Sequence, residues 1–156
     1  MYEEKFMMEA IRLSQKCLSE GKGGPFGAVV VKDGKIVGRG SNHVTINNDP
    51  TAHAEVMAIR EACHNLNSFQ LTGCEIYTSC EPCPMCLGAI YWARPDRIYY
   101  AANQVDAAKA GFDDSFIYKE IALNPTDRKI PASQHLRDEA NKTFDAWMKN
   151  TEKIEY

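Results

Sequence analysis

Two short stretches, His53-Ala54-Glu55 and Pro82-Cys83-Pro84-Met85-Cys86, constrain the fold of this chain more than any other feature. Imidazole and thiolate groups are good zinc ligands, and a catalytic zinc site uses three protein ligands so that one position stays open. His53, Cys83 and Cys86 supply three such ligands, so the fold has to bring two distant segments together. Glu55 is then left as a base that can take a proton from metal-activated water.

The residues around these stretches predict an α/β fold. We expect helices at residues 3–20, 50–65, 82–94 and 136–147, and strands at residues 26–31, 35–40, 74–79 and 97–101. Residues 116–121 fit either a short strand or a helical turn. Strands joined by helices run parallel, which predicts a mixed sheet with helices on both faces. Both metal-binding stretches lie at predicted helix N-termini, and sheets of this kind bind ligands at the carboxyl ends of their parallel strands.

Composition favours a small neutral ligand. The chain has 156 residues, enough for one domain, with 44% hydrophobic and 25% charged residues and a net charge of −3. A protein that binds a phosphate backbone normally carries a basic face, so we expect no nucleic-acid partner. The N-terminus lacks the layout of a signal peptide, and the apolar runs are too short to span a bilayer. Six cysteines without an export signal favour thiols or metal ligands, so we expect a cytoplasmic protein with no membrane contact.

The cysteine pattern allows other interpretations. Cys83 and Cys86 alone would also suit a redox pair or half of a structural zinc site. Cys80 extends the series, so a structural site that uses Cys80, Cys83, Cys86 and His53 is an alternative. Because Cys80 ends a predicted strand and Pro82 turns the chain after it, we expect Cys80 to be a buried residue.

Residues 49–55 (DPTAHAE) and 81–90 (EPCPMCLGAI) resemble the zinc motif of the cytidine deaminase superfamily. Within that superfamily the chain is most similar to bacterial guanine deaminases, most specifically at residues 91–95 (YWARP) and 111–118 (GFDDSFIY). The resemblance implies a three-layer α/β/α fold with a mixed five-stranded sheet, formed by a single domain of residues 1–156. It also implies one Zn²⁺ per subunit and hydrolytic deamination of guanine to xanthine and ammonia, in purine catabolism or salvage. Deaminases of tRNA adenosine and of cytosine or cytidine share the zinc motif and remain alternatives.

The choice of base depends on residues outside the motif. Guanine presents N1–H and its 2-amino group as donors on one edge, and O6 and N7 as acceptors on the other. Asp114 suits the donor edge and Asn42 an acceptor, although the residues alone favour an ordinary turn or loop position for each. The resemblance implies both roles and further substrate contacts by Phe26, Ala54, Trp92 and Tyr156. It implies that Glu55 carries the proton and that Asp114 assists at the amino group. It also implies a homodimer in which residues 151–156 form a lid over the neighbouring subunit.

Overall fold

A computed structural model describes all residues 1–156, and the chain divides into two units, Met1–Asp114 and Ser115–Tyr156. The first unit contains a four-stranded sheet in the order β2-β1-β3-β4. Its strands are β1 (Gly27–Lys32), β2 (Lys35–Ser41), β3 (Cys74–Cys80) and β4 (Arg97–Ala102). Strand β1 runs antiparallel to β2 and β3, and β3 runs parallel to β4. The carboxyl ends of β2, β3 and β4 therefore meet at one edge, and the predicted mixed sheet is confirmed.

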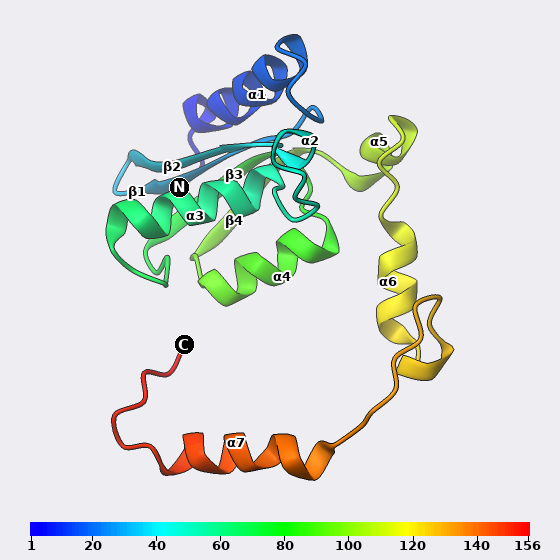
Figure 1. Ribbon diagram of the computed structural model, residues 1–156. Helices are drawn as coiled ribbons and strands as arrows, with labels where there is room; N and C mark the ends of the chain where they lie inside the picture. The colour runs from blue at the N-terminus through cyan, green and yellow to red at the C-terminus, as the bar shows by residue number, and fades with distance from the viewer. The chain divides into compact units, whose positions relative to one another are not determined.

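Helices cover both faces of this sheet. Val29 and Val31 of β1 pack on α1 (Glu4–Ser19), whereas Ala28 and Val30 face the layer of α3 (Ala54–Leu66) and α4 (Pro84–Ala93). Figure 1 shows α1 on one side of the sheet and α3 with α4 on the other. The alternation follows from the two-residue period of a strand. The expected three-layer α/β/α arrangement is thereby confirmed.

The sheet has four strands instead of the expected five. Residues 116–121, which fitted a strand or a helical turn, lie in helix α6 (Ser115–Ala122). The apolar residues of this segment follow a helical period, with polar residues between them, so a strand of the same residues would mix both kinds on each face. Strand β4 is accordingly the last strand of the sheet.

Helix α3 lies unusually close to β2 because β2 contains glycines. A side chain on Gly40 would collide with the main-chain oxygen of Ala54, and one on Gly38 would collide with that of Ala58. Small residues on both partners let a helix backbone approach a strand in this way. Since α3 begins at Ala54, the contact with Gly40 places the N-terminal end of the helix at the carboxyl edge of the sheet.

Helix α3 begins four residues later than predicted. A helix over residues 50–65 would have Asp49 as its N-cap and Pro50 as its first residue. Instead, the Asp49 carboxylate accepts hydrogen bonds from the Thr51 N–H (2.8 Å) and the Thr51 hydroxyl (2.7 Å), which closes a separate turn. His53 takes the N-cap position with an extended backbone, and the helix follows it.

Two short helices lie in stretches where no helix is predicted from the sequence. These are α2 (Val44–Asn47) and α5 (Gln104–Lys109). Helix α5 starts with a capping box, in which the Asn103 side chain accepts from the main-chain N–H groups of Val105 and Asp106, and the Asp106 carboxylate accepts from the Asn103 N–H.

The second unit consists of α6, a 3₁₀ turn at Pro125–Asp127 and α7 (Arg137–Lys149). Helix α7 confirms the predicted amphipathic C-terminal helix. None of these elements buries a residue. Residues 152–156 belong to no helix or strand. Across the whole chain, every helix is too short or too polar to cross a bilayer.

Candidate metal centre and active site

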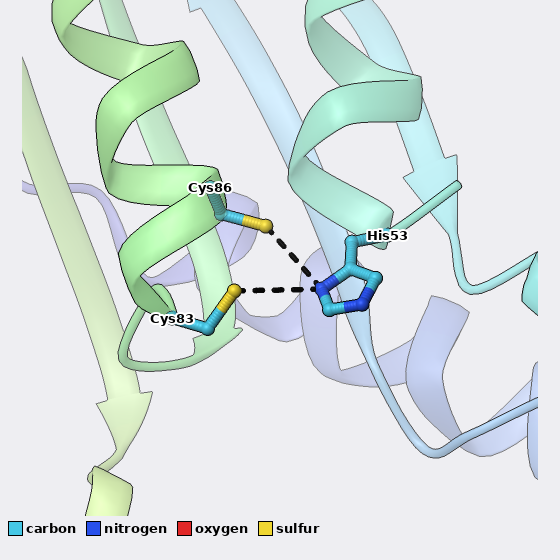
Figure 2. Close-up of side chains that lie close together, drawn as sticks. All are labelled: His53, Cys83 and Cys86. Atoms are coloured by element: carbon cyan, nitrogen blue, oxygen red, sulfur yellow. Dashed lines mark hydrogen bonds between the residues drawn. The ribbon is translucent and has the colours of Figure 1, made fainter. Parts of the chain in front are cut away.

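Three metal-binding side chains meet where α3 and α4 begin. His53 is the N-cap of α3, Cys83 is the N-cap of α4, and Cys86 lies in the first turn of α4. His53 Nδ1 lies 3.6 Å from the Cys83 sulfur and 3.5 Å from the Cys86 sulfur, as Figure 2 shows. The ligand atoms of the three residues are all within 4.8 Å of one another. One imidazole and two thiols form a donor set that suits zinc and leaves a fourth position for water.

The surroundings of the cluster favour the thiolate form of Cys83. Hydrogen bonds from Cys86 and His53 lower the pKa of the Cys83 thiol to about 4. The hydrogen bond with Cys83 raises the pKa of His53, and the same neighbour together with burial raises the pKa of Cys86. The N-terminus of α4 also stabilises negative charge at this place. Because the thiolate is the form that binds metal, the surroundings hold Cys83 in the form that can coordinate zinc.

Glu55 lies beside the three ligands and is almost completely buried. It is 6% exposed, and the Cys86 thiol donates to its Oε2 at 3.4 Å. Burial raises the pKa of the Glu55 carboxyl, and the Cys83 thiolate raises it further. A carboxyl whose pKa is raised by burial next to a metal site is a candidate for proton transfer.

Cys80 does not join the cluster. It is buried, as the sequence predicted, and its thiol donates to the main-chain oxygen of Asn103 at 3.7 Å. Burial raises the pKa of this thiol to about 11. The structure therefore lends no support to a four-ligand structural site that includes Cys80.

Asn42 and Asp114 bring polar groups to the same edge of the sheet. Asn42 is 7% exposed, and its Oδ1 accepts from the main-chain N–H groups of Gly24 (3.4 Å) and Val44 (3.2 Å). The side-chain amide is thus held with its NH₂ group available as a donor. Asp114 is half-buried, and burial followed by the charge of Cys83 raises the pKa of its carboxyl. Asp114 therefore lies within electrostatic reach of the cluster.

The remaining predicted site residues differ in burial and in the element or unit to which they belong. Ala54 is completely buried directly after His53, and Phe26 is half-buried with its main-chain oxygen accepting from Asn42 N–H at 3.2 Å. Trp92 lies near the C-terminal end of α4 and is 66% exposed, so the helix carries it away from the ligands in its first turn. Tyr156 belongs to the second unit.

Phe112 is a neighbour of this region that the sequence interpretation did not single out. Its ring contacts that of Phe26 edge to face, with ring centroids 4.9 Å apart and planes at 86°. The residue lies within the diagnostic stretch 111–118, but an aromatic side chain in a loop is more often a simple packing residue. Only its contact with Phe26 distinguishes it.

The fold and the ligand cluster agree with comparisons to known proteins. Residues 1–102 match the cytidine and deoxycytidylate deaminase zinc-binding region, so the chain belongs to this deaminase family. A zinc cofactor is the expected partner of the histidine and the two cysteines in this family.

Individual relatives show which kinds of deaminase the chain is similar to. The chain is 56% identical to guanine deaminase of Bacillus subtilis (strain 168) over 156 residues, which is 100% of both chains. An X-ray structure of guanine deaminase from B. subtilis superposes with a TM-score of 0.96, over 100% of this chain and 99% of that one. A guanine deaminase structure from Nitrosomonas europaea is 32% identical, with a TM-score of 0.69 over 72% of this chain and 65% of that one. A tRNA-specific adenosine deaminase of Aquifex aeolicus is 41% identical over 80% of this chain and 81% of its own length.

Proposed function

We propose that this protein hydrolyses guanine to xanthine and ammonia. The observation that carries the proposal is the 56% identity to B. subtilis guanine deaminase over the full length of both chains, including the unit beyond the zinc-binding region. The histidine and two cysteines that meet at the N-termini of α3 and α4 supply the chemistry that such a reaction needs. The reaction would serve the breakdown or salvage of purine bases.

His53, Cys83 and Cys86 would hold the zinc ion. When bound, zinc lowers the pKa of a coordinated water and so supplies a nucleophile near neutral pH. Glu55 would take a proton from the attacking water and deliver it to N3 of the purine while oxygen adds at C2. The second proton of that water would pass to the amino group, which leaves as ammonia, and Asp114 would assist this transfer. The raised pKa of the Glu55 carboxyl suits a group that must both accept and return a proton.

Guanine would be held by groups that match its two edges. The Asn42 amide presents its NH₂ group to an acceptor on the base, because its oxygen is already occupied by main-chain donors. Asp114 would accept from the N1–H and 2-amino edge. Phe26 and Ala54 would provide the apolar walls of the site.

We also propose that residues 151–156 act as a lid on the single domain 1–156, and that the active form is a homodimer. In this arrangement Tyr156 would close the site of the neighbouring subunit, and Trp92 would be a further wall around the base. The second unit supports the idea because it buries no residue of its own and exposes large apolar side chains, including Phe144, Trp147 and Met148. Apolar surface on this scale normally marks an interface.

A cytoplasmic location is part of the same proposal. All six cysteines are unpaired in the structure. A reducing compartment keeps thiol ligands such as Cys83 and Cys86 available for metal.

Substrate comparison tests the proposed reaction directly. The zinc-loaded protein is incubated separately with guanine, adenine, cytosine and a tRNA anticodon stem-loop while released ammonia is measured. We expect ammonia from guanine, with xanthine formed in equal amount. Ammonia from the stem-loop alone would instead assign the chain to the activity of its tRNA-deaminase relatives.

A further inference from the structure

The two proposed recognition residues, Asn42 and Asp114, lie on separate segments of the first unit. We propose that Phe112 is a positioning residue that fixes these two segments relative to each other by packing against Phe26. The role of Asn42 and Asp114 toward guanine rests on the proposed function, whereas the coupling between the segments is a property of the fold.

On one side, Phe26 is connected to Asn42 through the main chain. The Phe26 oxygen accepts from the Asn42 N–H at 3.2 Å, and the Phe26 N–H donates to the Gly24 oxygen at 2.8 Å. The Gly24 N–H in turn donates to the Asn42 side-chain oxygen at 3.4 Å. These three hydrogen bonds make Gly24, Phe26 and Asn42 one small connected group, so a displacement of Phe26 would be transmitted to the Asn42 amide.

In the segment that carries Asp114, Phe112 follows helix α5, and hydrogen bonds hold the start of this helix close to the metal ligands. The Gln104 N–H donates to the Glu81 carboxylate at 3.1 Å, and the Cys80 thiol donates to the Asn103 oxygen. Glu81 is only two residues before Cys83. The start of α5 is therefore held next to the cluster.

The end of α5 directs Phe112 toward Phe26. The Phe112 N–H donates to the Ala107 oxygen at 3.0 Å, and Gly111 has a φ of +92°, a conformation that glycine adopts without strain. The helix therefore ends in a tight turn at residues 110–111. Asp114 follows two residues after Phe112, so the chain allows at most about 7 Å between their Cα atoms, and the position of Phe112 limits that of Asp114.

The contact between the two phenylalanine rings joins these sides. An edge-to-face pair at 4.9 Å is a favoured aromatic geometry. Gly24 makes room for it, since a side chain there would lie 3.2 Å from Phe26 ring carbons and 3.5 Å from the Phe112 ring. Phe112 remains 44% exposed, so its contribution is the specific contact with Phe26 and not a place in the core.

The test compares Phe112→Ala with Phe112→Tyr and with Phe69→Ala. Phe69 is a matched control because it is 55% exposed and lies between α3 and β3, away from the site. Amide hydrogen exchange is followed by mass spectrometry in the zinc-loaded protein. We expect Phe112→Ala to speed exchange in residues 24–26 and 111–114 together, Phe112→Tyr to restore protection, and Phe69→Ala to leave both segments unchanged.

Steady-state kinetics with guanine give a second measurement. We expect Phe112→Ala to raise KM about tenfold, equivalent to about 1.4 kcal/mol, with a smaller change in kcat and unchanged zinc content. Unchanged exchange in residues 24–26 would overturn the coupling, as would equal effects from Phe69→Ala. If the wild-type protein releases no ammonia from guanine, the proposed function fails, and the exchange comparison still decides the role of Phe112.

Discussion

At the scale of single residues, the surroundings of Glu55 support its proposed role as the base. The carboxyl group is 6% exposed and accepts a hydrogen bond from Cys86, which is also one of the three clustered metal-binding residues. Glu55 is not one of the three, so in the proposed reaction its carboxylate would be left to act as the base. Two thiolates almost neutralise the charge of Zn²⁺, which makes a nearby base more necessary.

Replacing Glu55 with glutamine should separate metal binding from turnover. We expect Glu55→Gln to keep one zinc per chain and to lower kcat for guanine by about 10²–10⁴-fold, because the amide cannot carry the proton. Metal analysis and ammonia release measure the two effects. Cys80→Ser is the control and should keep both zinc and activity, since the Cys80 thiol contacts Asn103 and not the cluster. Loss of zinc from Cys80→Ser would instead support a structural zinc site in which Cys80 is a ligand.

Tyr77 gives a pH-dependent prediction away from the site. Its side chain is fully buried in β3, and the hydroxyl donates to Glu75 Oε2 at 3.2 Å. Burial raises the pKa of Tyr77 to about 12, against about 10 in an unfolded chain. The folded state therefore holds the phenol proton more tightly. This contribution to stability is complete below pH 10 and is lost as the pH rises toward 12.

Urea unfolding of the wild type and Tyr77→Phe at several pH values isolates this effect. The wild type should lose about 1.4 kcal/mol of unfolding free energy relative to Tyr77→Phe between pH 8 and pH 11. Lysine titration affects both proteins equally and cancels in the difference. A difference that stays constant over this range would show that Tyr77 ionises normally in the folded state.

At the scale of elements, the contact between α3 and β2 decides where His53 lies. Gly40→Ala would drive a side chain into the main chain of Ala54, the residue after His53. We expect a loss of about 1–3 kcal/mol in unfolding free energy, together with weaker zinc binding. Chemical denaturation and competition with a zinc chelator measure these two changes.

Gly88→Ala is the matched control for this substitution. Gly88 lies within α4, and a side chain there would meet no atom within 4 Å. Alanine is a better helix former than glycine, so this variant should be unchanged or up to about 1 kcal/mol more stable. Equal losses from both variants would mean that the close approach of α3 to β2 has no special role.

Much of this arrangement could be predicted because the sequence carries local signals for it. The spacing of Cys83 and Cys86 after a strand predicted that both would lie at a helix start, and His53 was expected at another. Helix α4 ends at Ala93, one residue before the predicted end, because Pro95 disfavours a helical conformation at Arg94. These signals depend on residues that are close in the sequence. They can therefore be interpreted without knowledge of the tertiary contacts.

The missed features depend on contacts that a sequence pattern does not show. The Asp49 side chain could either cap a helix or close a turn, and the structure has the turn. Asn103 and Asp106 are spaced as a capping box, but the mixed composition around them gives no helical period, and so the sequence does not predict α5. Phe112 could not be distinguished from a packing residue, because its importance lies in the distance to Phe26.

At the scale of the whole molecule, the second unit is notable because it has no core of its own. Its two α-helices bury no residue, and α7 carries Phe144, Trp147 and Met148 with large exposed fractions. A segment of 42 residues without a core of its own is too small to be stable alone. Association with other apolar surface is therefore required, and a second copy of the chain is the partner that we propose.

Mixing two defective chains tests whether the lid crosses between subunits. One chain lacks residues 151–156 and has an intact metal site; the other is full-length Glu55→Gln, which has a lid and no base. Each alone should turn over guanine slowly.

If the lid closes the neighbouring site, the mixed dimer contains one complete site. Co-expression in equal amounts should then restore about one quarter of wild-type activity, because half of the dimers are mixed and each has one working site. Glu55→Gln that also lacks residues 151–156 is the control partner and should restore nothing. A lid that folds back over its own chain predicts no gain from either mixture, so the rate of ammonia release in the first mixture distinguishes the two arrangements.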